Sequence, residues 1–409
     1  MTICLIGNGY DLHHKLPTNY LDFLHIVQFL IEHKNVVYNN LGEILSADEV
    51  FSTNDFIKTV YKQHSDAYNN IKPDVEDFQQ IVTMAENNVW FRYLYDAINK
   101  SLGWIDFEKE IGKVLDAFEE FFEHEECIHS YGEKCVFDWH TYECDQQTRF
   151  IVSRFNFFYH AENESSGFSK GTQVIKTEYI IEDPINSGYI YLDTEKISSD
   201  LFESMIALAK IIGLYLKIFV EDLLIYLQEN KYSISCASYP KTDFVVNFNY
   251  TRTYEAFGNP NANVEHIHGS FDHDIVLGIN PNEKDEIYNI DTTFLQFKKY
   301  YQRVFYGTDL TYLRKMQDLK ASKKYDSGHT LYVIGHSLDE TDKDMIVELF
   351  DVASKIIVLY HDKKAVARYI RNLVRIYGKD RFDKVRVEKK LTFLKQSELT
   401  WNKQPLEYN

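Results

Sequence analysis

The feature that most constrains the fold is a short apolar strand at the start of the chain whose parallel partners all lie far downstream. Thr2–Ile6 reads as a buried strand that stops at a glycine-containing turn. Apolar strands that alternate with helical segments begin again only near Asp243, a pattern typical of a parallel sheet covered by helices on both faces. The first strand must therefore pair across a long intervening segment. This predicts an α/β, Rossmann-like fold built from a discontinuous domain.

The predicted α/β domain consists of residues 1–34 and 240–400, and residues 35–239 form a large, mainly helical insertion. A chain of 409 residues is long enough to bury such a core together with an addition. Further strands of the domain are predicted at Phe244–Phe248, Ile275–Ile279, Leu331–Ile334 and Ile356–Tyr360. A small β-containing segment is expected near residues 135–196, with strands at Val174–Ile181 and Tyr189–Leu192.

Composition excludes several classes of protein. The five cysteines are scattered, odd in number and without a Cys-x-x-Cys pair, so we expect neither a disulfide framework nor a zinc ribbon. No metal cofactor is expected. No signal peptide or membrane span is expected, and a cytoplasmic location fits best. The net charge of −18 makes nucleic-acid binding unexpected, and the Lys- and Arg-rich segment 363–386 is interpreted as a solvated helix face or a local basic patch.

The turn Gly7-Asn8-Gly9 lies where a doubly wound fold places its phosphate loop, between the first strand and the first helix. Small residues there let backbone N–H groups face an anion. The third glycine of the dinucleotide fingerprint is missing, because Tyr10 and Asp11 follow instead. A tight turn without a ligand remains the alternative.

Asn247, Asn249 and Thr251 follow the strand that starts near Asp243. Ligands of open α/β sheets bind beyond the carboxyl ends of the strands, and an amide there can both donate and accept hydrogen bonds. The alternative is an asparagine that satisfies the backbone of its own turn.

The segment His266-Ile-His268-Gly269-Ser270 follows within one connection. His268 is suited to accept a proton from water or from a ribose hydroxyl, and Gly269 would let a ligand approach closely. His266 and His268 alternate along a strand and should point to opposite faces, which disfavours a shared metal site. A core histidine without a chemical role is the stronger alternative.

A third apolar strand ends in Gly335-His336-Ser337, and a fourth ends at Tyr360-His361. Ser337 could bond a phosphate or a ribose, and His361 could line the adenosine side or cap a helix. A serine-hydrolase nucleophile elbow is disfavoured, because Leu338 and Asp339 replace its second glycine.

Together these segments resemble the AbiH family of bacteriophage abortive-infection proteins. The resemblance rests on motifs in the order of that family and covers most of the chain outside residues 135–196. The motifs are residues 5–12, Leu16-Pro17-Thr18-Asn19-Tyr20, Trp104–Glu108, Asn247–Tyr250, His266–Gly269 and Val333–Leu338.

The AbiH family is similar in turn to sirtuin-like proteins, whose Rossmann-type domain binds NAD+ and several of whose antiviral members hydrolyse it. On this likeness, Asn249 corresponds to the asparagine that positions substrate and water, and His268 to the histidine of the His-Gly motif. Gly335 and Ser337 correspond to the turn that holds ribose and phosphate. Thr251 replaces the aspartate that reads nicotinamide, and the sirtuin loop arginine has no evident counterpart. The zinc-ribbon cysteines are also missing, which argues against a protein deacylase.

The resulting interpretation is an antiphage effector that binds NAD+ and hydrolyses it to nicotinamide and ADP-ribose. The predicted catalytic residues are His268, Asn249 and Asp11, the last of which would stabilise the developing cation or cap a helix. The predicted nucleotide-binding residues are Gly7, Asn8, Gly9, Asn247, Gly269, Ser270, Gly335, His336, Ser337 and His361.

Two other functions stay open: a sensor or scaffold that binds a nucleotide without cleaving it, and a metal-dependent nuclease that uses Asp342, Asp344 and the histidines as metal ligands. The 30 tyrosines and 28 phenylalanines favour a homo-oligomer. A phage-derived trigger or an accessory protein is a further expected partner.

Overall fold

The computed structural model describes most of the chain. The described residues are 1–53, 55–98, 106–131, 134–139, 146–159, 172–182, 190–230, 242–259, 261–280, 292–322 and 328–396. The predicted domain boundary at residue 240 and the motif residues Trp104 and Ile105 lie outside these ranges.

The chain divides into two compact units. Unit 1 contains Met1–Val82, Ala209–Val276 and Tyr300–Asn409, and unit 2 contains Thr83–Leu208 and Leu277–Lys299. Both units are thus discontinuous in sequence, and the helical segments between Tyr20 and Tyr68 belong to the same unit as the sheet. Residues 35–239, the predicted insertion, therefore include parts of both units.

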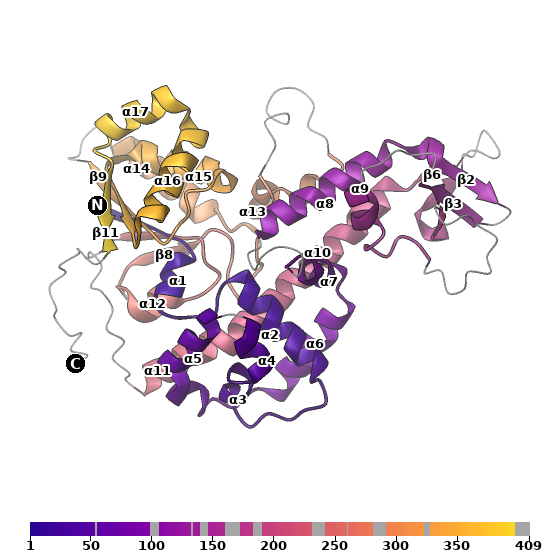
Figure 1. Cartoon of the computed structure of the whole chain (residues 1–409). Coiled ribbons are helices and arrows are strands. Elements are labelled where there is room, and N and C mark those ends of the chain that lie inside the picture. Colours follow the sequence, from indigo (N-terminus) through magenta and orange to yellow (C-terminus); the bar gives the residue numbers. More distant parts are fainter. Residues whose placement is uncertain are drawn as a thin grey trace. The chain divides into compact units, whose positions relative to one another are not determined.

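Unit 1 is organised around a sheet of six parallel strands (Figure 1). Its order is β11-β10-β9-β1-β7-β8, so the N-terminal strand lies at the centre. When the six strands are numbered 1 to 6 in chain order and the sheet is read from β8 to β11, the order is 3-2-1-4-5-6. Doubly wound folds that bind dinucleotides have this order. The strands are β1 (Thr2–Ile6), β7 (Phe244–Asn247), β8 (Asn263–His266), β9 (His329–Ile334), β10 (Ala353–Tyr360) and β11 (Thr392–Lys395).

The α/β class and the parallel pairing of the first strand are therefore confirmed. Ile3 pairs with Phe244 on one side and with Leu331 on the other. The predicted strand at Ile275–Ile279 is wrong: this buried segment is a loop, in which only Ile279 forms an isolated bridge, to Lys298. The prediction gave no strand at β11. It also placed both His266 and His268 on a strand, whereas β8 ends at His266; both edge strands are short and partly polar.

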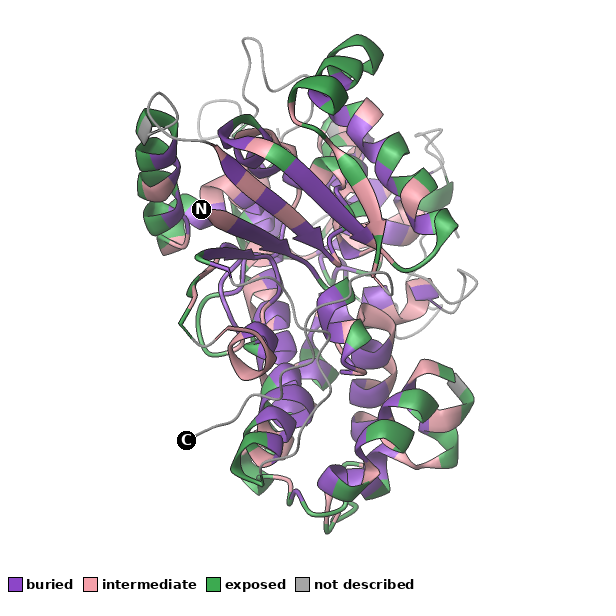
Figure 2. Ribbon diagram, turned by 90° about the vertical axis from the view of Figure 1, so that its left-hand side faces the viewer, coloured by how far each residue is buried: buried purple, intermediate pink, exposed green. Residues whose placement is uncertain are grey.

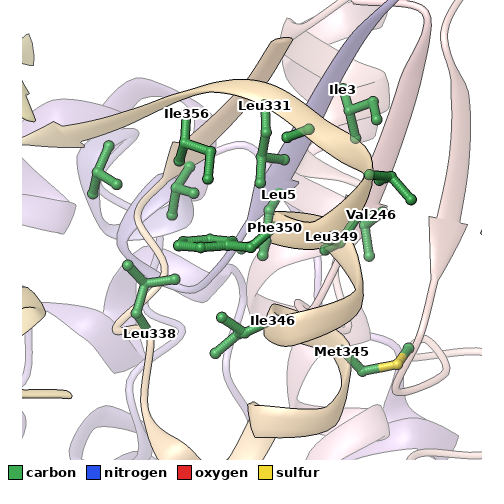
Figure 3. Packing of buried hydrophobic residues seen from close by; sticks show 14 of the residues in the cluster. Ile3, Leu5, Val246, Leu331, Leu338, Met345, Ile346, Leu349, Phe350 and Ile356 are labelled. Atoms are coloured by element: carbon green, nitrogen blue, oxygen red, sulfur yellow. The ribbon is translucent and has the colours of Figure 1, made fainter. Parts of the chain in front are cut away.

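Alternate residues of the strands build two cores, one on each face of the sheet. On one face Ile3, Leu5, Val246, Leu331 and Ile356 pack against the helix α15 (Lys343–Val352), as Figure 3 shows. On the other face Cys4, Ile6 and Val245 pack with Tyr10 and Tyr254. Figure 2 shows the result: the strands are largely buried, and the covering helices expose their outer sides.

The helices of unit 1 include those that cover the sheet and those that surround its first loop. They are α1 (Gly9–His13), α2 (Tyr20–Glu32), α3 (Leu41–Leu45), α4 (Asp48–Thr53), α5 (Asp55–Tyr68), α11 (Asp222–Glu229), α12 (Thr253–Phe257), α13 (Lys299–Tyr306), α14 (Leu310–Ser322), α15 (Lys343–Val352), α16 (Lys363–Tyr377) and α17 (Lys379–Glu388). The unit boundary falls within α6 (Val75–Asn87) and α10 (Thr194–Leu216), and it also separates Lys299, the first residue of α13, from the rest of that helix. A single π-helical turn, η3 (Lys217–Glu221), joins α10 to α11, and a 3-10 turn, η6 (Glu340–Asp342), precedes α15.

Unit 2 combines helices with two small antiparallel sheets. Its elements are α7 (Val89–Ile98), α8 (Phe107–Phe122), α9 (Gln146–Val152), β2 (Ile128–Tyr131), β3 (Lys134–Asp138), β4 (Thr172–Ile175), β5 (Ile180–Glu182) and β6 (Ile190–Leu192). The segment predicted as one strand, Val174–Ile181, contains the end of β4 and the start of β5, because a 3-10 turn at Thr177–Tyr179 separates them. Tyr189, the predicted start of the next strand, lies outside the described residues.

Within the described ranges, no helix combines the length and the apolar character that crossing a membrane requires.

Candidate functional site

The candidate site lies at the carboxyl edge of the six-stranded sheet. Because all six strands are parallel, the loops after β1, β7, β8, β9 and β10 leave from the same edge. The chain adds strands on one side of β1 and then on the other, so the topological switch point falls between β1 and β9. Ligands of doubly wound sheets bind at this point. The loops that meet there begin at Gly7 and Gly335.

A buried carboxylate, Asp11, links the first helix to the end of β7. Its side chain in α1 is only 1% exposed. The Asn249 amide Nδ2 donates to Asp11 Oδ1 at 3.1 Å, and the Thr251 hydroxyl donates to Oδ2 at 2.6 Å. Thr253 in turn donates to the Thr251 hydroxyl at 3.0 Å. The structure thus brings together two of the three predicted catalytic residues, Asp11 and Asn249, and Thr251 adds a hydroxyl to the pair.

Burial makes Asp11 a weak acid. It raises the pKa of Asp11 from 3.8 to about 6, although the hydrogen bonds from Thr251, Thr253 and Asn249 lower it. Such a carboxyl group changes its charge close to neutral pH, which is common among groups at functional sites.

A second buried carboxyl group, Glu221, lies near Asp11 and was not predicted. Burial raises the pKa of Glu221 from 4.5 to about 7, the backbone N–H of Arg252 lowers it, and the charge of Asp11 raises it further. That N–H donates to Glu221 Oε1 at 2.8 Å. Glu221 is the last residue of the π-helical turn η3, and such turns are frequent at functional sites. In the sequence it looked only like a charge that interrupts an apolar helix.

His266, at the end of β8, supports Asn249 from behind. Its Nε2 lies 2.7 Å from Glu255 Oε1, and its Nδ1 lies 3.1 Å from the Asn249 carbonyl oxygen. Burial lowers the pKa of His266. The hydrogen bond to Glu255, the negative charge of Glu255 and the hydrogen bond to the Asn249 carbonyl raise it by more, so the pKa of His266 lies above 6.5. His266 therefore holds the backbone of a predicted catalytic residue.

His268 belongs to a different group of side chains. Its Nε2 lies 3.5 Å from Asp342 Oδ1, and His336 Nε2 lies 3.3 Å from Asp342 Oδ2. The Leu338 N–H donates to His336 Nδ1 at 3.0 Å, so the hydrogen of the neutral His336 ring sits on Nε2 and faces Asp342. The sequence placed both histidines at strand ends but did not indicate that Asp342 joins them.

Phe248 connects the histidine group to the Asp11 group. Its ring lies 5.1 Å from the His268 ring and 4.6 Å from the His336 ring, centroid to centroid. Phe248 directly precedes Asn249 in the chain. Both groups of polar side chains are therefore positioned by the carboxyl end of β7.

The glycines of the two switch-point loops let the loops touch. The Gly9 N–H donates to the Gly335 carbonyl at 2.8 Å, and the Gly7 N–H donates to the Ile334 carbonyl at 3.1 Å. A Cβ atom on Gly335, whose φ is +69°, would lie 2.2 Å from the Tyr10 nitrogen. Glycine is thus required at these positions because the backbones of the two loops are in direct contact. The contact of these glycines with phosphate stays a prediction.

Gly269 has a similar local explanation. Its φ is +76°, and a Cβ atom there would lie 1.8 Å from the Asp274 carbonyl oxygen. The tight turn after His268 therefore demands glycine whether or not a ligand approaches.

The remaining predicted nucleotide contacts divide into exposed residues and residues held within the protein. Asn8, Gly9, Ser337 and His361 are exposed at the carboxyl edge. Asn8 exchanges hydrogen bonds with Thr18, and Ser270 donates to Asp272. Asn247 accepts from the Asn249 N–H at 2.9 Å, which makes it the backbone-satisfying asparagine of its turn.

Metal ligation finds no support in the described ranges, where no group of three or more His, Cys, Asp and Glu residues is placed to hold an ion. The two aspartates of the nuclease alternative have other neighbours. Asp342 contacts the two histidines, and Asp344 pairs with Arg303.

A family model described as "Bacteriophage abortive infection AbiH" matches residues 3–360. Neither a curated protein nor a solved structure matches the chain.

Proposed function

The chain belongs to the AbiH family of bacteriophage abortive-infection proteins, and we propose that it acts by cleaving NAD+ at its N-glycosidic bond. The family implies a role in abortive infection. In the proposed reaction the protein binds NAD+ at the carboxyl edge of the sheet and releases nicotinamide and ADP-ribose. Loss of NAD+ would then stop the infected cell from supporting phage growth.

The observation that carries the proposal is the Asp11–Asn249 pair at the switch-point edge. An amide and a carboxylate from distant segments converge where dinucleotides bind in this strand order. In the neighbouring histidine group, the Asp342 carboxylate lies 3.5 Å from His268. Hydrolases with a Ser-His-Asp triad also place a carboxylate beside the histidine that acts as the general base.

The proposed chemistry uses each group for one task. The bond between ribose C1′ and the nicotinamide nitrogen breaks, and its electron pair leaves with nicotinamide. The ionised Asp11 carboxylate stabilises the positive charge that develops on the ribose. Asn249 orients the attacking water, and His268 accepts a proton from it as the new C1′–O bond forms.

Access to this site is part of the proposal. Asn249 is 7% exposed and His268 is 5% exposed, so NAD+ reaches them only after a rearrangement. We therefore expect a resting protein that a phage-derived signal or an accessory protein activates.

The test is incubation of purified protein with NAD+, with and without lysate from phage-infected cells, followed by chromatographic separation of the products. Wild type should form nicotinamide and ADP-ribose, and His268→Ala and Asn249→Ala should each lower the rate about 10²-fold or more. His273→Ala and Asn261→Ala are matched controls, because they change exposed residues of the same types. Intact NAD+ in every arm would refute the proposal.

A second candidate, binding of the nucleotide without cleavage, is favoured by one observation. The Asn249 side chain already donates to Asp11, and its N–H donates to Asn247, so it is held within the protein. Recovery of uncleaved nucleotide with the activated protein would support this sensor function and exclude the enzyme.

A further inference from the structure

A strongly basic surface on α16 and α17 has no part in the proposed reaction. Residues 363–390 contain eleven Lys and Arg and three Asp and Glu, a net charge of +8 in a chain of net charge −18. The rest of the chain therefore carries −26. The two helices, yellow in Figure 1, belong to unit 1.

The structure places the charges of α16 on one face. Lys364, Arg368, Arg371 and Arg375 recur at intervals of four, three and four residues, so they lie within about 60° of one another around the helix. All four are exposed, and none of them forms a salt bridge with a described carboxylate. At a rise of about 1.5 Å per residue, this basic stripe is roughly 16 Å long.

The second helix extends the basic surface. Lys379, Arg381, Lys384 and Arg386 of α17 are exposed. Among them only Arg386 has a described ion pair, to Asp383 at 3.4 Å. Repulsion between these positive charges on two adjacent helices slightly destabilises the isolated protein. A polyanionic partner would remove this repulsion.

The other face of α16 decides against a membrane partner. Five of its apolar residues, Ala365, Tyr369, Leu373, Ile376 and Tyr377, are buried in the core of the sheet, and Ile370 is 39% exposed. A membrane-surface helix needs a free apolar face to insert beneath the lipid headgroups.

The aromatic residues decide against single-stranded nucleic acid. Proteins that bind single strands stack the bases on exposed aromatic side chains. Tyr369, Tyr377 and Phe382, the aromatic residues of α16 and α17, are all buried. What remains exposed suits the phosphates of a duplex, because the guanidinium group of arginine binds phosphate through two parallel hydrogen bonds.

We propose that the basic stripe on α16, with α17 beside it, binds the phosphate backbone of double-stranded DNA. The contact would be independent of base sequence, and the acidic remainder of the chain would keep the DNA on this surface alone. It would give the protein a direct means of contacting phage DNA during infection.

The experiment is fluorescence anisotropy of a short labelled DNA duplex, titrated with the full-length protein at several salt concentrations. Four phosphate contacts predict a slope of log K against log salt of about −3.6, or roughly 150-fold weaker binding at about 200 mM than at about 50 mM salt. Arg368→Gln with Arg371→Gln should make this slope smaller by about 1.8. Lys364→Gln with Arg375→Gln should do the same and serves as an independent second variant.

The matched control is Lys62→Gln with Arg92→Gln, which removes the same charge from exposed positions on α5 and α7. Its slope should equal that of wild type. The proposal is overturned if wild type does not bind the duplex, or if the control changes the slope as much as the stripe variants do. Binding to anionic vesicles or to an RNA duplex, without binding to DNA, would also overturn it. None of these outcomes depends on NAD+ cleavage.

Discussion

Replacing Asp11 by Asn should make the protein more stable and abolish its activity. The pKa of Asp11 is raised from 3.8 to about 6, chiefly by burial. At 1.36 kcal/mol per pH unit, the ionised carboxylate therefore costs the folded state about 3 kcal/mol. Asparagine removes this cost, and the Thr251 hydroxyl can reverse its hydrogen bond to meet the new amide. After allowance for weaker hydrogen bonds, we expect a net stabilisation of about 1–3 kcal/mol at pH 7.5.

The pH dependence follows from the sign of the pKa change. Because the folded protein holds this proton more tightly than the unfolded chain does, the contribution of Asp11 to stability is present below pH 3.8 and is lost as the pH rises to about 6. Wild type should therefore lose free energy of unfolding over this range, and Asp11→Asn should lose less.

The assay is equilibrium denaturant unfolding between pH 4 and pH 8. Asp318→Asn is the control, because it removes an exposed carboxylate from α14 and should retain the wild-type pH profile. An Asp11→Asn protein that is less stable than wild type at pH 7.5 would refute the reasoning. It would mean that Asp11 is a structural carboxylate stabilised by its partners.

Three further predictions use other parts of the structure. In denaturant unfolding, Gly335→Ala should destabilise the protein by at least about 2 kcal/mol more than Gly378→Ala does. Both glycines have a φ of +69°, but of the two only Gly335 faces backbone atoms. Equal losses of unfolding free energy in the two variants would contradict this. Glu255→Gln should lower the pKa of His266, which NMR titration of the His266 ring would measure. The substitution should also remove a contribution to stability that wild type has below pH 6.5 and loses as the pH rises through the raised pKa of His266. An unchanged titration would show that Glu255 does not act on His266. Cys4, whose pKa burial raises to about 12, should react with iodoacetamide at pH 8 only after unfolding, and peptide mapping that finds it labelled in the native protein would show the strand to be open.

The central strands were predictable from the sequence because each is a continuous apolar run that ends in glycine or a polar residue. Thr2–Ile6 agrees with the structure at both ends, and the other central strands agree within a few residues. The loop at Ile275–Ile279 misled the prediction because a buried apolar segment has the same pattern in a loop as in a strand.

The partners of the site residues could not be predicted, because they come from distant segments. Thr251 reaches Asp11 across 240 residues of sequence, and no local pattern encodes that contact. Glu221 and Glu255 were missed for the same reason, since a lone carboxylate in a helix usually reads as a solvated charge. Asp342 was named only for the nuclease alternative, and its contact with the two histidines was not predicted. The glycines were predicted at the right positions, but the sequence did not reveal that the two loops touch.

The most direct test of the proposed activity is the NAD+ content of cells during phage infection, measured by mass spectrometry. Cells that express the wild-type protein should lose NAD+ and accumulate nicotinamide and ADP-ribose, whereas cells that express His268→Ala or Asn249→Ala should do neither and should lose protection. Unchanged NAD+ in wild-type cells that still resist the phage would contradict the account.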